Sequence, residues 1–134
     1  MSEYIIVCVK DSIKERHFIT LWRPNNSGYT AVIDRAGRYT AEQVIARLDY
    51  YNDGDNVAVP ASLIAGLGVQ SPARWFDYPG ACVLSTRENW ARIKAEVIAR
   101  PANRIKPEPV GKQALALLNA RYANDGMTRT GVPA

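Results

Sequence analysis

Few side chains in this sequence could carry out nucleophilic or acid–base chemistry. His17 is the only imidazole, and it lies in an apolar stretch next to Phe18. A serine or cysteine nucleophile usually relies on a histidine base, and no nucleophile-elbow pattern accompanies His17. We therefore interpret His17 as a structural or surface histidine and predict that the protein is not an enzyme. Acid–base chemistry by carboxylates and arginines is the alternative that the sequence leaves open.

Metal and cofactor chemistry are not indicated either. Cys8 and Cys82 each lie in an apolar run without a CxxC partner, which predicts buried thiols, with a disulfide as the alternative. The acidic residues within 49–55 lack the spacing and the closing glutamate of a calcium loop. Gly66–Gly68 lacks the third glycine of a dinucleotide fingerprint, and the chain has no Walker motif. We predict no metal site and no cofactor.

Arginines and aromatic residues gather in two neighbouring segments, residues 22–29 and 34–40. Guanidinium groups beside aromatic rings can hold a phosphate, a base or an acidic side chain of a protein. The alternative is that Trp22 and Tyr39 pack in the core while the glycines and proline build turns. The aromatic loop 75–79 could anchor an interface or cover the core. The predicted partner-binding residues are Arg23, Tyr29, Arg35, Arg38, Trp75 and Tyr78.

Positive charge is concentrated toward the end of the chain. Residues 1–84 carry a net charge of −1 and residues 85–134 a net charge of +5, which together give the overall +4. Such asymmetry is typical of a surface for an acidic partner, although a solvated surface is the alternative. The alternative prediction is therefore a nucleic-acid or nucleotide binding protein. Its binding residues would be Arg23, Arg38, Arg104 and Lys106.

The strands that would position these residues form an antiparallel meander at the start of the chain. Residues 4–9 are a continuous apolar run, which predicts a strand covered on both faces. Residues 17–22 predict a second strand whose alternate residues face opposite sides. Residues 24–28 predict a turn in which Gly28 or an asparagine has a positive φ. A third strand is predicted over 29–34. Residues 81–84 predict a later strand.

Two capping boxes predict helices. In the first, Thr40–Gln43, side chains satisfy free backbone N–H groups at the start of a helix that ends near residue 52. Val44, Leu48 and Tyr51 would form its apolar stripe. The second box, Ser85–Glu88, predicts a helix that runs to about Arg100, where a proline follows.

Together these elements predict the α+β class, with a small antiparallel sheet of three to five strands packed against two or three helices. The predicted organisation is a core domain over 1–100, a proline-containing connector over 101–110, a C-terminal helix over 111–124 and a loose tail over 125–134. The C-terminal helix would pack on the core or on a second copy, which makes a homodimer an alternative. No apolar stretch reaches the ~20 residues that span a bilayer, and no secretory signal precedes the first strand. We expect a cytoplasmic protein without membrane contact.

Four short segments resemble small proteins encoded by tailed phages and prophages. They are LWRPNNSGYT at 21–30, AGRYT at 36–40, VAVP at 57–60 and STRENW at 85–90. The resemblance covers roughly residues 4–100 and implies an accessory protein that acts inside the bacterial host cell. On this basis we expect a non-enzymatic protein that binds a host or phage protein complex. Blocking a defence or nucleic-acid-processing machine would be its role.

Overall fold

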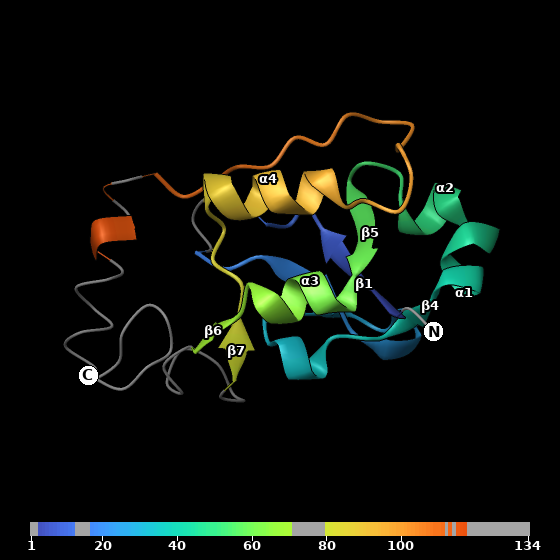
Figure 1. Cartoon of the computed structure of the whole chain (residues 1–134), viewed down its shortest axis with the longest axis horizontal. Helices are drawn as coiled ribbons and strands as arrows, with labels where there is room; N and C mark the ends of the chain where they lie inside the picture. Colours follow the sequence, from blue (N-terminus) through green and yellow to red (C-terminus); the bar gives the residue numbers. More distant parts are fainter. Residues whose placement is uncertain (1–2, 13–16, 71–79, 112, 114, 118–134) are drawn as a thin grey trace.

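The computed structural model describes residues 3–12, 17–70, 80–111, 113 and 115–117, and its centre is a five-stranded antiparallel sheet (Figure 1). The strands are β1 (Glu3–Cys8), β2 (Thr20–Trp22), β3 (Tyr29–Thr30), β4 (Tyr39–Thr40) and β5 (Asn56–Pro60). β5 pairs with β1 from Tyr4 to Cys8 and so occupies one whole edge of it. β2 and β4 share the other edge, at opposite ends of β1, and β3 extends the sheet beyond β2. The predicted α+β class and antiparallel meander are therefore confirmed.

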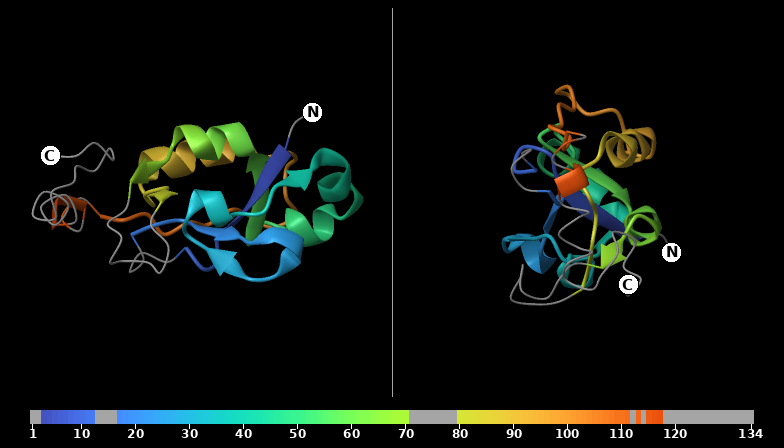
Figure 2. Two further views of the ribbon diagram at one scale, coloured as in Figure 1. Left: turned by 90° about the horizontal axis from the view of Figure 1, so that it is seen from below. Right: turned by 90° about the vertical axis from the view of Figure 1, so that its left-hand side faces the viewer.

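Helices cover both faces of this sheet, which explains why β1 is apolar without alternation (Figure 2). On one face, Ile5 and Val7 pack in a core cluster with side chains of α3 (Ala61–Gly66) and α4 (Arg87–Ala95). On the other face, Ile6 packs in a cluster with side chains of α1 (Ala41–Ala46) and α2 (Leu48–Tyr51). The sheet is thus the middle of three layers. The segment that follows α4 returns along the outside of that helix (Figure 1).

A smaller sheet closes one end of the molecule. It consists of β6 (Val69–Gln70) and β7 (Ala81–Cys82). Beyond β7 the chain pairs with the residues before β2, because the N–H of Ile19 donates to the carbonyl of Val83 and the N–H of Ser85 to that of His17. Residues 17–19 thereby connect the two sheets. Cys8 and Cys82 are both buried free thiols, as predicted.

The Thr40 cap of the first box is confirmed, but the Gln43 side chain donates to the hydroxyl of Tyr51 and does not complete the box. The cap of the second box is shifted by one residue. Thr40 Oγ1 accepts a hydrogen bond from the N–H of Gln43, whereas α4 is capped by Thr86 and not by Ser85. Ser85 is buried and its hydroxyl accepts a hydrogen bond from the indole of Trp90. The hydroxyl of Ser85 is therefore used within the core, and the hydroxyl of Thr86 caps the helix.

Several predicted boundaries were wrong. β2 begins at Thr20 and not at residue 17, and β7 ends at Cys82 and not at residue 84. The helix predicted over 40–52 breaks at Arg47, where φ is −139°, and gives the separate helices α1 and α2. α4 ends at Ala95 and not near Arg100, because the next residues bond to β5 and its adjoining turn. The third strand covers only Tyr29–Thr30, since a 3₁₀ turn replaces it at Ile33–Arg35. The helix predicted over 111–124 is helical at 113 and 115–117, whereas residue 111 is not helical. Residues 112, 114 and 118–124, like the predicted tail, lie outside the described residues.

Candidate anion-binding site

The turn between α2 and β5 holds the chain segment that follows α4. Asn52 is only 3% exposed, and its side-chain amide both donates and accepts a hydrogen bond. Its Nδ2 donates to the carbonyl of Ala99 at 2.8 Å, and its Oδ1 accepts from the N–H of Ala58 at 3.0 Å. The N–H of Ile98 also donates to the carbonyl of Ala58 at 2.9 Å. Residues 98–99 are therefore fixed against the edge of β5.

The chain after α4, from residue 96 to residue 106, is called the returning segment. A glycine lets it approach this turn closely. Gly54 has a φ of +107°, a conformation that side-chain-bearing residues rarely adopt. A Cβ placed on Gly54 would lie 2.7 Å from the carbonyl carbon of Asn103. The neighbouring carbonyl of Asp53 accepts a hydrogen bond from the N–H of Asn103 at 3.1 Å. The turn thus fixes both ends of residues 99–103.

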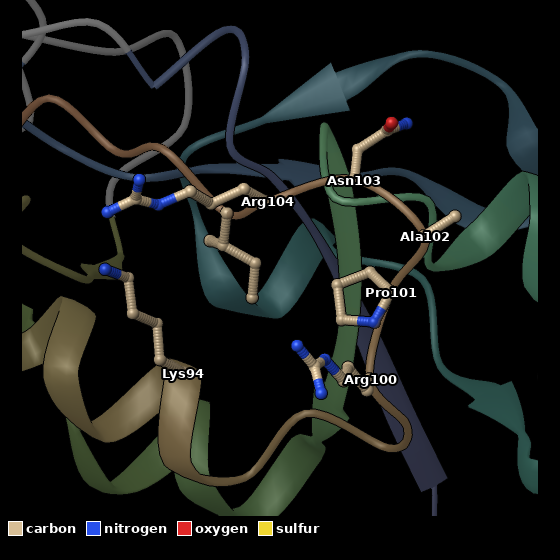
Figure 3. Close-up of a pocket in the computed structure, with 7 residues that line it drawn as sticks. Lys94, Arg100, Pro101, Ala102, Asn103 and Arg104 are labelled. Carbon is tan, nitrogen blue, oxygen red and sulfur yellow. The ribbon is translucent and has the colours of Figure 1, made fainter.

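A pocket lies between residues 99–103, which the turn holds in place, and the last turn of α4. The pocket has a volume of about 540 Å³, and we call it the basic pocket. Figure 3 shows Lys94 rising from α4 toward Arg104, while Arg100 enters from the start of the returning segment. Its remaining lining comes from Pro101, Ala102, Asn103 and Ile105.

The basic pocket concentrates unneutralised positive charge. Three cationic side chains line it, and no carboxylate does. Within the described part of the chain, Lys94, Arg100 and Arg104 make no ion pair, whereas nearby Arg92 is paired with Glu96 at 3.8 Å. Like charges held in a concave surface raise the local potential and attract anions. The arrangement is therefore suited to binding a phosphate or carboxylate group.

A second pocket of about 560 Å³ adjoins the first, and the two share Asn103 and Arg104 in their linings. This second pocket carries both signs of charge, so we call it the mixed pocket. Its cations are Lys10, Arg104 and Lys106, and its carboxylates are Asp55 and Glu108. Among the described residues, Arg104 is thus the one cationic residue that lines both pockets.

The residues predicted at the hairpin lie elsewhere on the molecule. Tyr29, Arg35 and Arg38 are exposed and Arg23 is half-buried, and none of them lines either pocket. The predicted Trp75 and Tyr78 lie outside the described residues.

The packing alternative considered for Trp22 and Tyr39 is confirmed. Trp22 and Tyr39 are 7% and 2% exposed and meet edge to face. The hydroxyl of Tyr39 donates to the carbonyl of Arg23 at 2.6 Å and accepts from the N–H of Asn26 at 3.1 Å. These aromatic side chains build the hairpin and the core.

Of the alternative set, Arg104 and Lys106 line pockets, but Arg23 and Arg38 do not join them. The predicted binding residues did not include Lys94, Arg100 or Asn103, although Arg100 belongs to the basic end that the sequence indicated. Lys94 belongs to α4, and no local pattern distinguishes it from other helix-surface lysines. Only the docking of the returning segment on the 52–56 turn brings Lys94 and Arg104 together.

An exposed aromatic surface lies on the opposite side of the sheet from α3 and α4. Tyr50 is 42% exposed, packs on Trp22 at 5.3 Å between ring centroids and carries the guanidinium of Arg47 over its own ring. Tyr29 is 55% exposed and pairs with Trp22 across β2 and β3. The charge of Cys8 is the largest of several influences that raise the pKa of Tyr29, and Tyr50 contributes as well. We call Tyr29 and Tyr50 the tyrosine pair.

Comparisons of the chain with protein-family models, with curated proteins and with solved structures find no match. The resemblance to small phage proteins therefore stays a prediction. No group of three or more potential metal ligands occurs among the residues that the structure describes. None of the helices in that same part of the chain is both long and apolar enough to cross a membrane. Function is accordingly inferred from the geometry of the pockets.

Proposed function

We propose that this protein is a non-enzymatic binding protein whose basic pocket receives a phosphate group of a nucleic acid or nucleotide. The observation that carries the proposal is the convergence of Lys94, Arg100 and Arg104 on one pocket without a carboxylate in its lining. Among the described residues these cations have no acidic partner. An anion from outside the chain would supply that partner.

The types of side chain favour phosphate over a simple carboxylate. An arginine guanidinium can donate two parallel hydrogen bonds to a phosphate, and a lysine ammonium adds a compact charge. Three donors from different directions suit an anion with several equivalent oxygens. Because the pocket is open to water, each contact contributes modestly, and affinity depends on several contacts acting together.

The resemblance to phage proteins supports a cellular setting for this activity. We place the protein in the cytoplasm of a bacterial host, as a phage-encoded accessory protein that acts by occupying its target. In this setting a bound nucleic acid or nucleotide would be one that a host defence or nucleic-acid-processing machine also uses.

The test is the affinity of a fluorescently labelled single-stranded oligonucleotide of about twelve nucleotides at low salt. The triple variant Lys94→Gln/Arg100→Gln/Arg104→Gln should bind at least about tenfold more weakly than the unaltered protein. The matched control removes three other exposed cations, as Arg47→Gln/Arg87→Gln/Arg92→Gln, and should leave affinity almost unchanged. Equal weakening by both triple variants, or no binding by the unaltered protein, would refute the proposal.

A protein partner is a second proposal, and the tyrosine pair favours it. Tyr29 and Tyr50 are large exposed side chains beside the buried Trp22, and exposed aromatic residues are common anchors of protein interfaces. Capture from host lysate should then return one partner in near-stoichiometric amount. The variant Tyr29→Ser/Tyr50→Ser should lose this partner, while the triple variant of the basic pocket should retain it. Unchanged capture by the tyrosine variant would contradict the second proposal.

A further inference from the structure

The mixed pocket differs from the basic pocket in offering hydrogen-bond acceptors. Asp55 and Glu108 line it, and within the described residues their side chains make no hydrogen bond or ion pair. Asp55 uses only its backbone carbonyl, which accepts from the N–H groups of Val9 and Lys10 at 2.8 and 3.1 Å. These two carboxylates offset two of the three cations in the lining, so the mixed pocket attracts a phosphate less strongly than the basic pocket does. The mixed pocket is therefore suited to a different part of the ligand.

The part of a nucleotide that matches two carboxylates is a base that carries an exocyclic amino group. Aspartate and glutamate accept hydrogen bonds from N4 of cytosine, and uracil and thymine present a carbonyl oxygen at the same position. A carbonyl oxygen facing Asp55 or Glu108 would be repelled and would leave both carboxylates without a donor. Lys10, Lys106 and the amide of Asn103 can serve the acceptor atoms of the base.

The linings of the two pockets overlap, so a ligand that spans Asn103 and Arg104 would contact both. Asn103 and Arg104 belong to both linings, so the pockets meet at these two residues. In the described part of the chain no aromatic side chain lines either pocket. Base stacking, which tolerates any base, would therefore contribute little, and hydrogen bonding would decide which base binds.

We propose that the basic pocket holds the phosphate of a nucleotide while the mixed pocket holds its base, with cytosine preferred over uracil or thymine. This inference rests on the proposed function and names the ligand class of the same site. The shared chemistry is a cytidine phosphate, which exists as a free nucleotide or within a single strand. The discriminating contacts are made by Asp55 and Glu108.

The test compares labelled oligo(dC) and oligo(dT) of about twelve nucleotides at neutral pH and low salt. We expect oligo(dC) to bind at least about fivefold more tightly. The variant Asp55→Ala/Glu108→Ala should bring the two affinities within about twofold of each other. The matched control Asp34→Ala/Glu42→Ala removes two exposed carboxylates that line neither pocket and should keep the preference.

Competition by free cytidine monophosphate identifies the source of the ligand. Displacement of oligo(dC) by the mononucleotide, and not by uridine monophosphate, would assign the site to free nucleotides. Failure of both mononucleotides to compete, with oligo(dC) still preferred, would assign it to a strand. Equal binding of oligo(dC) and oligo(dT), both lost in Lys94→Gln/Arg100→Gln/Arg104→Gln, would overturn the base preference and leave the proposed function standing. Absence of binding to either oligomer would overturn both.

Discussion

Gly54 and the backbone of Asn103 approach each other so closely that no side chain fits between them. A Cβ on Gly54 would lie 2.7 Å from the carbonyl carbon of Asn103, and the φ of Gly54 is +107°. The two residues are far apart in the sequence, yet their contact fixes the segment that carries Arg100 and Arg104. The turn after α2 therefore shapes the basic pocket without contributing a charge to it.

Substituting Gly54→Ala should damage both stability and binding. The new methyl group would displace the returning segment, and the positive φ adds strain on the order of 1–3 kcal/mol. We expect a lower urea midpoint and weaker binding of an oligonucleotide.

Gly66→Ala is the matched control for Gly54→Ala, because nothing lies within 4 Å of its added Cβ. Gly66 belongs to α3, where alanine favours the helix, so this control should be neutral or up to about 1 kcal/mol stabilising. A Gly54→Ala variant as stable and as active in binding as the control would contradict this account of the turn.

Substituting Tyr39→Phe should loosen the hairpin tip. The Tyr39 hydroxyl bonds the carbonyl of Arg23 and the N–H of Asn26, next to two asparagines at positive φ. Losing a buried hydroxyl that makes two hydrogen bonds should lower the free energy of unfolding by about 1–2 kcal/mol. Tyr29→Phe removes an exposed hydroxyl and should change stability by less than about 0.5 kcal/mol. Urea denaturation of the two variants compares them directly, and equal midpoints would show that the Tyr39 hydroxyl is dispensable.

Stability should fall in alkaline solution because of Cys8. Burial is the largest cause that raises the pKa of the Cys8 thiol from its usual value near 9 to about 11. The folded protein therefore holds this proton more tightly than the unfolded chain. The contribution of the protonated Cys8 thiol to the free energy of unfolding is fully present below about pH 9 and is lost as the pH rises through about 11.

The measurement is the free energy of unfolding at about pH 8 and about pH 10.5. The decrease in the free energy of unfolding that is due to Cys8 should reach up to about 2 kcal/mol between these two pH values. A Cys8→Ala variant starts from a lower stability because it leaves a cavity, but its decline with pH should be shallower by that amount. Parallel declines in the two proteins would show that Cys8 does not titrate with a raised pKa.

The sequence predicted those parts of the fold that depend on local chemistry. The apolar run at 4–9 indicated a strand covered on both faces, and the structure places helices on each side of β1. Thr40 was recognised as a helix cap because its hydrogen bond closes within three residues. Positive φ near the hairpin tip was predicted from glycine and asparagine, and Gly28 has a φ of +104°.

The remaining features depend on contacts between distant segments. Ser85 has the residue type of a cap, but the indole of Trp90 bonds its hydroxyl within the core. α4 stops at Ala95 because the backbone beyond it bonds to β5, which no helix-stop signal encodes. Lys94 and Arg104 become neighbours only when Asn52 and Gly54 dock the returning segment. Charge composition alone located the basic end but not the pocket.

The most direct test of phosphate binding in the basic pocket is the salt dependence of oligonucleotide affinity between about 50 and about 200 mM salt. For a single strand, each neutralised phosphate contributes about −0.7 to the slope of log K against log salt. If Lys94, Arg100 and Arg104 together neutralise about three phosphate charges, the slope of the unaltered protein should be near −2, and Lys94→Gln/Arg100→Gln/Arg104→Gln should bring it close to zero. A slope that is the same in both proteins would contradict the account.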